Sequence, residues 1–140
     1  MKTRAPLSVL AVLTAMLLAG CAPPAVRTAD LDCSNTPECR IQVSVNCSMT
    51  IFCGVAVDHD RVIGRRNGKI DWEIVTNGYT FGSANGIVFA SAPSVFQCHV
   101  EANGRRFSCA NRGDRGEYKY TINLSGSPSV GPLDPWVVNN

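Results

Sequence analysis

Asp58, His59 and Asp60 are adjacent and form the densest cluster of polar side chains in the sequence. Carboxylates around an imidazole are groups with which proteins bind metal ions or transfer protons. In a strand, however, neighbouring side chains point to opposite faces, so three adjacent groups do not easily converge on one point. We therefore interpret Asp58-His59-Asp60 as a solvated loop.

Cys98 and His99 are a second pair with reactive side chains, suited to a nucleophile with its base or to a copper site. A copper site would also draw on His59 and Met49. Alternation along this segment predicts that Cys98 points inward and His99 outward, so that the pair diverges. The motifs C-x-x-C, G-x-S-x-G and H-E-x-x-H do not occur, and we expect neither an enzyme nor a cofactor or metal.

Basic side chains gather beside two predicted turns, Asn67-Gly68 and Asn103-Gly104. If both turns lie at one end of the domain, they form a cationic patch whose arginine forks suit the carboxylates or phosphates of an envelope polymer or acidic protein. Charge also keeps exposed turns soluble, and we prefer that simpler interpretation. The candidate binding patch comprises Arg65, Arg66, Lys69, Arg105 and Arg106.

The first 21 residues have the features of an export signal. A basic start, with Lys2 and Arg4, precedes an apolar run from Leu7 to Leu18, which is too short to span a membrane comfortably. The rest of the chain has 11 basic and 11 acidic residues, since Lys2 and Arg4 are two of the 13 basic ones. That balance gives no reason to expect a nucleic-acid partner.

The run Leu18-Ala19-Gly20-Cys21 resembles the lipobox of bacterial lipoproteins. The resemblance implies that the Cys21 sulfur carries diacylglycerol, that residues 1–20 are removed, and that the lipid holds the protein on a membrane. Ala22 rather than aspartate follows the cysteine, which favours the outer membrane by the sorting rule of enteric lipoproteins. The alternative is an ordinary secretory signal with a chance cysteine. Residues 21–30 then form the lipidated cysteine and a proline-containing tether, and residues 31–140 form one domain.

Six of the seven cysteines remain after Cys21 is assigned to the lipid, enough for three disulfides. With Asn103-Gly104 as a two-residue hairpin turn, Val100 lies opposite Phe107 and Cys98 lies opposite Cys109. We predict a disulfide between these two cysteines at a hydrogen-bonded pair, with a Cα separation of about 5.5 Å. For the other four, a local pairing and crossed pairings both stay open: Cys33, Cys39, Cys47 and Cys53.

Alternating apolar and polar residues dominate the mature chain and predict an all-β fold. Asn67-Gly68 is predicted to be a second hairpin tip that places Ile63 opposite Trp72. The expected strands cover residues 41–47, 51–57, 70–74, 86–90, 96–100 and 118–124.

The run Asp114-Arg115-Gly116-Glu117-Tyr118-Lys119-Tyr120 resembles the D-x-G-x-Y-x-C run of immunoglobulin-like domains, with Tyr120 in place of the cysteine. The resemblance implies a small antiparallel β-sandwich in which the Tyr118 hydroxyl bonds back to the backbone. It also makes Trp72 a candidate for the core tryptophan, and the replaced cysteine implies disulfides placed differently from those of antibody domains.

The end of the chain, Leu133 to Asn139, together with Tyr118 to Thr121, also resembles small exported proteobacterial proteins of unknown function. Trp136 there could close the core or serve as an exposed binding anchor, and we favour the core. We expect an envelope lipoprotein that acts as a non-enzymatic binding or adaptor module, with an envelope protein or polymer as partner. The alternative is an inhibitor or immunity-type protein against an envelope-attacking hydrolase.

Overall fold

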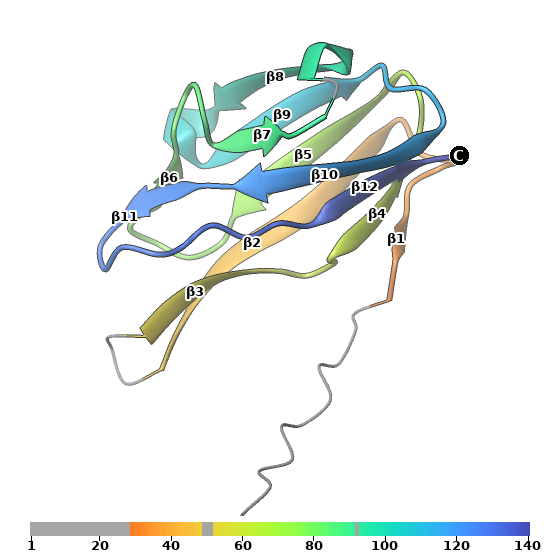
Figure 1. The fold of residues 1–140 in the computed structure, drawn as a ribbon. Helices are drawn as coiled ribbons and strands as arrows, with labels where there is room; N and C mark the ends of the chain where they lie inside the picture. Colours follow the sequence, from red (N-terminus) through yellow and green to blue (C-terminus); the bar gives the residue numbers. More distant parts are fainter. Residues whose placement is uncertain (1–28, 49–51, 92) are drawn as a thin grey trace, which may run out of the picture.

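The computed structural model describes residues 29–48, 52–91 and 93–140, which form an all-β sandwich (Figure 1). The predicted signal, Cys21, most of the tether and Met49 lie outside these residues. The first sheet has the order β1-β4-β12-β10-β7, the second β3-β2-β5-β9-β8, and β6 pairs with β11. The strands are β1 (Leu31–Asp32), β2 (Glu38–Ser48), β3 (Phe52–Val57), β4 (Arg61–Gly64), β5 (Gly68–Ile74), β6 (Tyr79–Phe81), β7 (Ile87–Phe89), β8 (Phe96–Glu101), β9 (Arg106–Asn111), β10 (Gly116–Ile122), β11 (Leu124–Gly126) and β12 (Trp136–Asn139), with short 3-10 turns at Pro93–Val95 and Ala102–Gly104.

The alternation in the sequence becomes the burial pattern of the strands, and the all-β class is confirmed. In β2, Ile41 and Val43 are fully buried while Gln42 between them is exposed. The two sheets face each other across a core that includes Trp72 on β5 and Tyr120 on β10. The Trp72 Nε1–H donates to the Tyr120 hydroxyl at 3.0 Å, and the two rings meet edge to face. This contact joins the two sheets at their centre.

The sheets are mixed rather than antiparallel, which corrects the sequence-based expectation. β2 runs parallel to β5, with Ile41 opposite Trp72, and β4 runs parallel to both β1 and β12. Alternation determines which face of a strand is buried but contains no information about the direction of its neighbour. The segments that connect the strands decided that direction.

Asn67-Gly68 is a turn between the sheets and not a hairpin tip. β4 belongs to the first sheet and β5 to the second, so Ile63 pairs with Val138 and not with Trp72. The turn itself forms as its residue types predict: Asn67 has a positive φ of 60° and the Gly68 N–H donates to the Arg65 carbonyl at 3.0 Å. The local turn chemistry was therefore predicted correctly, and the partner strand was not.

The second Asn-Gly pair does join a hairpin, between β8 and β9. Asn103 and Gly104 have positive φ values of 56° and 84°, and Val100 lies opposite Phe107 as predicted. The ladder ends at Glu101 and Arg106, because Ala102 also has a positive φ. Hydrogen-bonded pairs, with widely spaced Cα atoms, alternate along the ladder with closely spaced pairs that are not hydrogen-bonded. This longer turn moves the alternation by one residue pair relative to the two-residue turn that we expected. The Cys98 and Cys109 Cα atoms are accordingly 4.0 Å apart, the narrow spacing and not the wide one that we expected.

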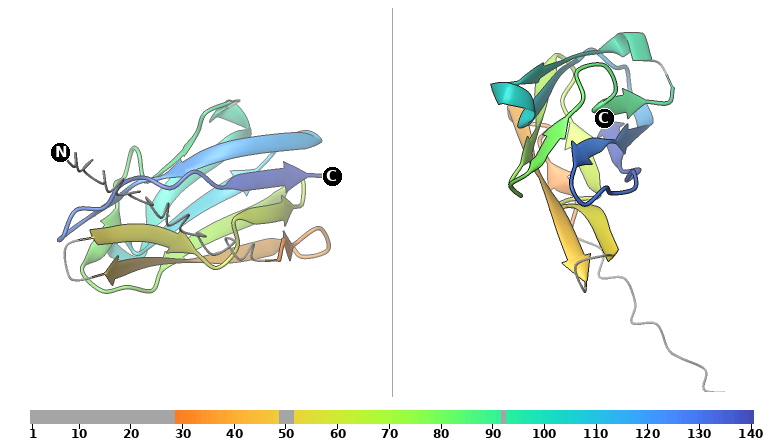
Figure 2. Two further views of the ribbon diagram at one scale, coloured as in Figure 1. Left: turned by 60° about the horizontal axis from the view of Figure 1, so that its bottom comes forward. Right: turned by 90° about the vertical axis from the view of Figure 1, so that its left-hand side faces the viewer.

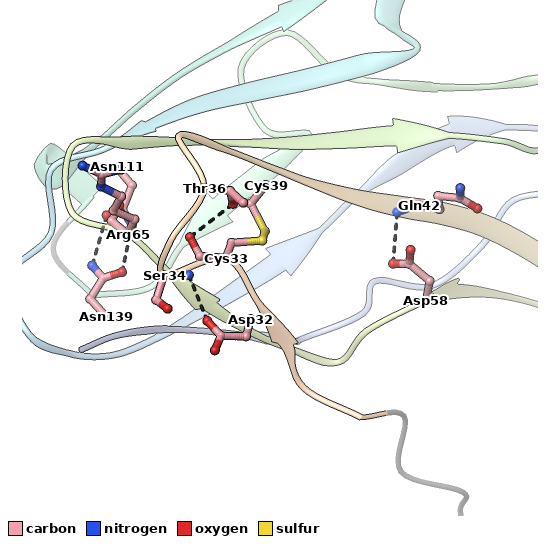
Figure 3. Close-up of a disulfide and its surroundings, with 10 residues drawn as sticks. All are labelled: Asp32, Cys33, Ser34, Thr36, Cys39, Gln42, Asp58, Arg65, Asn111 and Asn139. Carbon is pink, nitrogen blue, oxygen red and sulfur yellow. Dashed lines mark hydrogen bonds between the residues drawn. A yellow bond between two sulfur atoms is a disulfide. The ribbon is translucent and has the colours of Figure 1, made fainter.

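The three disulfides are Cys98–Cys109, which we predicted, and the local pairs Cys33–Cys39 and Cys47–Cys53. Cys33–Cys39 joins the ends of the loop between β1 and β2 (Figure 3). Cys47–Cys53 links directly opposed residues of β2 and β3. Each bridge therefore holds chain segments that already lie side by side. No helix in the described residues is long and apolar enough to cross a membrane.

Candidate functional site

The Asp58-His59-Asp60 segment is a loop between β3 and β4, and the side chains of Asp58 and His59 contact the backbone. Asp58 Oδ1 accepts the Gln42 N–H at 3.0 Å (Figure 3). His59 Nδ1 lies 2.7 Å from the Ala29 carbonyl oxygen. These bonds attach the loop to β2 and to the start of the described chain. Across 29–48, 52–91 and 93–140, no group of three or more His, Cys, Asp or Glu side chains could hold a metal ion.

Cys98 and His99 diverge as predicted. Cys98 is bonded to the fully buried Cys109, while His99 Nε2 lies 2.8 Å from Glu101 Oε1 on the outer face of the second sheet. Cys98 is nevertheless exposed, because β8 is an edge strand and has no neighbour on one side. We expected it to be covered, and the edge position is the reason that it is not.

The five basic residues of the candidate patch lie at opposite ends of the second sheet. Arg65, Arg66 and Lys69 surround the start of β5, whereas Arg105 and Arg106 lie beside its end, because β9 runs antiparallel to β5. Each group also has local acceptors: Arg66 pairs with Asp114 at 3.2 Å, and Arg105 donates to the Ile74 carbonyl at 2.6 Å. One continuous cationic patch is therefore not formed.

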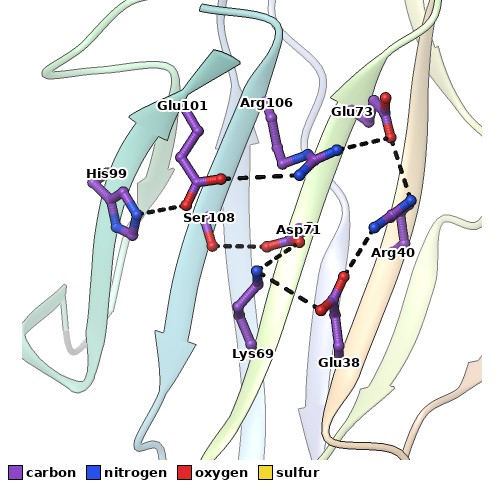
Figure 4. A network of polar contacts seen from close by, with 9 residues as sticks. All are labelled: Glu38, Arg40, Lys69, Asp71, Glu73, His99, Glu101, Arg106 and Ser108. Atoms are coloured by element: carbon purple, nitrogen blue, oxygen red, sulfur yellow. Dashed lines mark hydrogen bonds and ion pairs between the residues drawn. The ribbon is translucent and has the colours of Figure 1, made fainter.

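Charged side chains cross the outer face of the second sheet in paired rows (Figure 4). Asp71 at their centre is fully buried; its Oδ1 accepts the Ser108 hydroxyl at 2.7 Å and its Oδ2 lies 3.0 Å from Lys69 Nζ. The hydrogen bond with Asp71 raises the pKa of Lys69, against the opposing effect of partial burial. Because opposite charges alternate, this face is locally neutralised. Around this pair lie Glu38, Arg40, Glu73, His99, Glu101 and Arg106.

Trp136 belongs to the last strand but does not enter the core. Its side chain is 41% exposed, while the next residue, Val137, is fully buried. Trp136 pairs with Lys119 and Arg61 on its two sides, so it lies on the outer face of the first sheet. The interpretation of Trp136 as a core residue was wrong, because the register of β12 gives the inward position to Val137.

A cleft of about 240 Å³ lies where the edges of the two sheets meet, between β7 and β8. The rings of Phe89 and Phe96 stack at its floor with centroids 3.7 Å apart and join the two edge strands. Val88 at the rim is 41% exposed. The sequence did not predict this cleft, because the two strands become neighbours only when the sheets pack. The lining residues are Ala84, Ile87, Val88, Phe89, Phe96 and Cys98.

Among the edge strands that the structure describes, β8 is the longest one whose outer edge has no backbone bridge. β1 and β7 have two and three residues, and β3 is partly covered by a bridge between Gly54 and Gly131. β8 has six residues and pairs with β9 alone among the described strands. An uncovered strand edge presents unpaired N–H and C=O groups to another chain. β8 and the adjoining cleft, whose lining residues have apolar side chains, therefore form the candidate site, a peptide-binding edge.

No family model matches the chain, and no curated protein is significantly similar to it.

Proposed function

We propose that this protein is a lipid-anchored envelope lipoprotein whose β-sandwich is a non-enzymatic adaptor that binds an extended peptide segment along β8. The observation that carries the proposal is the uncovered six-residue edge of β8 beside the apolar cleft. A strand added to a sheet edge gains affinity from main-chain hydrogen bonds, and pockets for alternate side chains supply specificity.

The site favours a peptide with apolar side chains at alternate positions. Phe96 and Cys98 on β8 face the cleft, together with Ile87 and Phe89 on β7. The Cys98–Cys109 disulfide attaches β8 to β9, so the edge keeps its shape without a ligand. A preorganised edge reduces the ordering that binding requires, which favours affinity.

The lipobox-like run from Leu18 to Cys21 supports the anchor, and Ala22 after the cysteine supports an outer-membrane location. An immunoglobulin-like relationship is supported by the Tyr118 hydroxyl, which donates to the Asp114 carbonyl at 2.9 Å as that family's tyrosine corner does. Trp72 in the core supports the same relationship, and Tyr120 contacts it from the position where the family has cysteine. The parallel pairing of β2 with β5 departs from the antiparallel pattern.

Photo-crosslinking in living cells tests the adaptor proposal. A photoreactive phenylalanine analogue is placed at Val88, on the cleft rim, or at Val75, a matched exposed valine at the end of β5. We expect one envelope partner to be captured from Val88 and not from Val75, and to be lost in Cys21→Ser if the anchor brings the two together. A peptide made from the captured segment should slow amide hydrogen exchange in β8. No capture from Val88, or a peptide that leaves exchange in β8 unchanged, contradicts the proposal.

The anchor has its own measurement, because labelled palmitate should be incorporated into the wild-type protein and not into Cys21→Ser. The inhibitor alternative stays a prediction. It would be favoured if the captured partner were a hydrolase from outside the cell and the purified protein blocked its activity.

A further inference from the structure

The β2–β3 hairpin continues past the rest of the second sheet and projects from the domain (Figures 1 and 2). β2 pairs with β5 only as far as Val43 opposite Ile74. Its pairing with β3 continues to Ser48 opposite Phe52. The far part of the hairpin, residues 46–48 and 52–54, has one further backbone bridge, between Gly54 and Gly131 at its base, and is otherwise a two-stranded arm, which we refer to as the arm.

The arm is exposed and ends in an apolar side chain. Asn46, Cys47 and Ser48 are exposed, and Phe52 at 69% is the most exposed large hydrophobic residue in the described chain. An isolated two-stranded hairpin is at best marginally stable in water. The Cys47–Cys53 disulfide holds the two strands of the arm together at this point. The Cys47–Cys53 disulfide therefore stabilises the arm in which Phe52 is exposed and lies outside the core.

The hairpin also has no charge. The seventeen residues from Ile41 to Val57 include no Asp, Glu, Lys or Arg, although the neighbouring strands have paired charges on their outer faces. Exposed tips usually have charges that keep them soluble, as Arg65 and Arg66 do beside the turn between β4 and β5. An uncharged tip with an exposed aromatic residue is suited to an apolar medium, where a charge would be costly.

The tether is short enough for the arm to reach the membrane that holds the lipid on Cys21. Ala29 is eight residues after Cys21, so at full extension the lipid lies within roughly 28 Å of Ala29. His59 Nδ1 is 2.7 Å from the Ala29 carbonyl. Phe52 is seven residues before His59 on the same side of the fold, which corresponds to roughly 23 Å along a strand. In Figure 1 the arm and the start of the described chain both lie on the lower side of the fold, the arm at its left and the start of β1 at its right.

We propose that Phe52, on the described part of the arm, is a second membrane contact and enters the acyl chains of the membrane that holds Cys21. This inference rests on the proposed lipid anchor. Because the arm has no charge, its contact depends on apolar burial and should not weaken with salt. β3 and β8 are opposite edges of the second sheet, so the arm and the peptide-binding edge are separate sites.

Tryptophan fluorescence in vesicles tests the contact. The mature Cys21→Ser chain is joined at its first residue to a synthetic diacyl lipid, which makes the test independent of natural lipidation. Trp136→Phe removes the exposed indole, and Phe52→Trp then reports from the arm, while Trp72 stays buried. Vesicles of phosphatidylethanolamine and phosphatidylglycerol are used with ordinary or brominated acyl chains. The control is Val88→Trp in the same background, on the opposite edge of the sandwich.

We expect the emission of residue 52 to shift to shorter wavelength and to be quenched by bromine, equally at low and high salt, while residue 88 is unaffected. Unquenched, water-exposed emission from residue 52 would overturn the inference and favour a partner protein at the arm. Quenching that disappears in high salt would also overturn it, since it would indicate adsorption by charge. Failure of the anchor is a separate result, because it is read from palmitate incorporation in cells.

Discussion

The side chains of Asn111 and Asn139 form a closed pair of hydrogen bonds between the two sheets (Figure 3). Asn111 Nδ2 donates to Asn139 Oδ1 at 2.8 Å, and Asn139 Nδ2 donates to Asn111 Oδ1 at 3.0 Å. Both side chains are buried, and Asn111 also donates to the Arg65 carbonyl at 3.2 Å. The pair therefore fixes β12, the last strand, against β9 and the turn that crosses between the sheets.

Asn139→Ala should lower the free energy of unfolding by about 1–3 kcal/mol, because it removes two buried hydrogen bonds and leaves Asn111 with only the Arg65 carbonyl and the Gly113 N–H as partners. Urea unfolding of the unlipidated mature chain measures the change. Asn140→Ala, at the exposed last residue, is the control and should shift stability by less than about 0.5 kcal/mol. Equal effects of the two substitutions would contradict the role given to the amide pair.

Gly64→Ala should destabilise the same region, because the backbone of β4 passes close to the amide pair. A Cβ at Gly64 would lie 2.9 Å from Asn111 Nδ2 and 3.0 Å from Asn139 Oδ1. We expect a loss of about 1–3 kcal/mol from overpacking, measured by the same urea titration. Gly54→Ala is the matched control, since nothing lies within 4 Å of its Cβ position. A Gly64→Ala protein as stable as Gly54→Ala would show that the pair moves aside without cost.

Tyr120→Phe should cost about 1–3 kcal/mol near neutral pH, because the buried Trp72 N–H loses its acceptor. Burial also raises the pKa of Tyr120 above its ordinary value of 10.0, against the weaker opposing effect of the Trp72 hydrogen bond. A raised folded-state pKa contributes stability that is complete below the unfolded-state pKa and is lost as pH rises above it. The stability gap between wild type and Tyr120→Phe should therefore narrow from about pH 8 to about pH 11. If the difference in stability between the two proteins widened over this pH range, the pKa of Tyr120 would not be raised in the folded state.

Lys69→Met should destabilise the protein by about 1–3 kcal/mol, because it leaves the fully buried Asp71 carboxylate with Ser108 alone. The Lys69 side chain is itself 40% exposed, so we expect the lower part of that range. Arg66→Met is the control, since its partner Asp114 is 81% exposed and the pair is solvated. Thermal unfolding of both variants checks the difference, and equal melting temperatures would show that water satisfies Asp71 once the lysine is gone.

Several features followed from the sequence because they depend on neighbours along the chain. Alternation predicted that Ile41, Val43 and Val45 of β2 face the core, since side chains in a strand alternate with a fixed period. The Asn103-Gly104 turn determined the register that brings Cys98 to Cys109, because the position of a hairpin turn determines which residues of its two strands lie opposite each other. The resemblance to immunoglobulin-like domains, and not the local pattern, made Trp72 a candidate core residue, and the structure buries it completely.

Only the tertiary structure decided which strands are neighbours and what lies at their edges. Asn67-Gly68 formed the turn that its residue types favour, yet it crosses between sheets because β4 pairs with β12, more than seventy residues later in the chain. The antiparallel pairing of β9 with β5 separated Arg65 and Arg66 from Arg105 and Arg106. The register of β12 turned Trp136 outward. The cleft beside β8 and the Asn111–Asn139 pair arise where the sheets meet. Local sequence determines turn geometry and strand faces, whereas pairing over long distances depends on the packing of the whole chain.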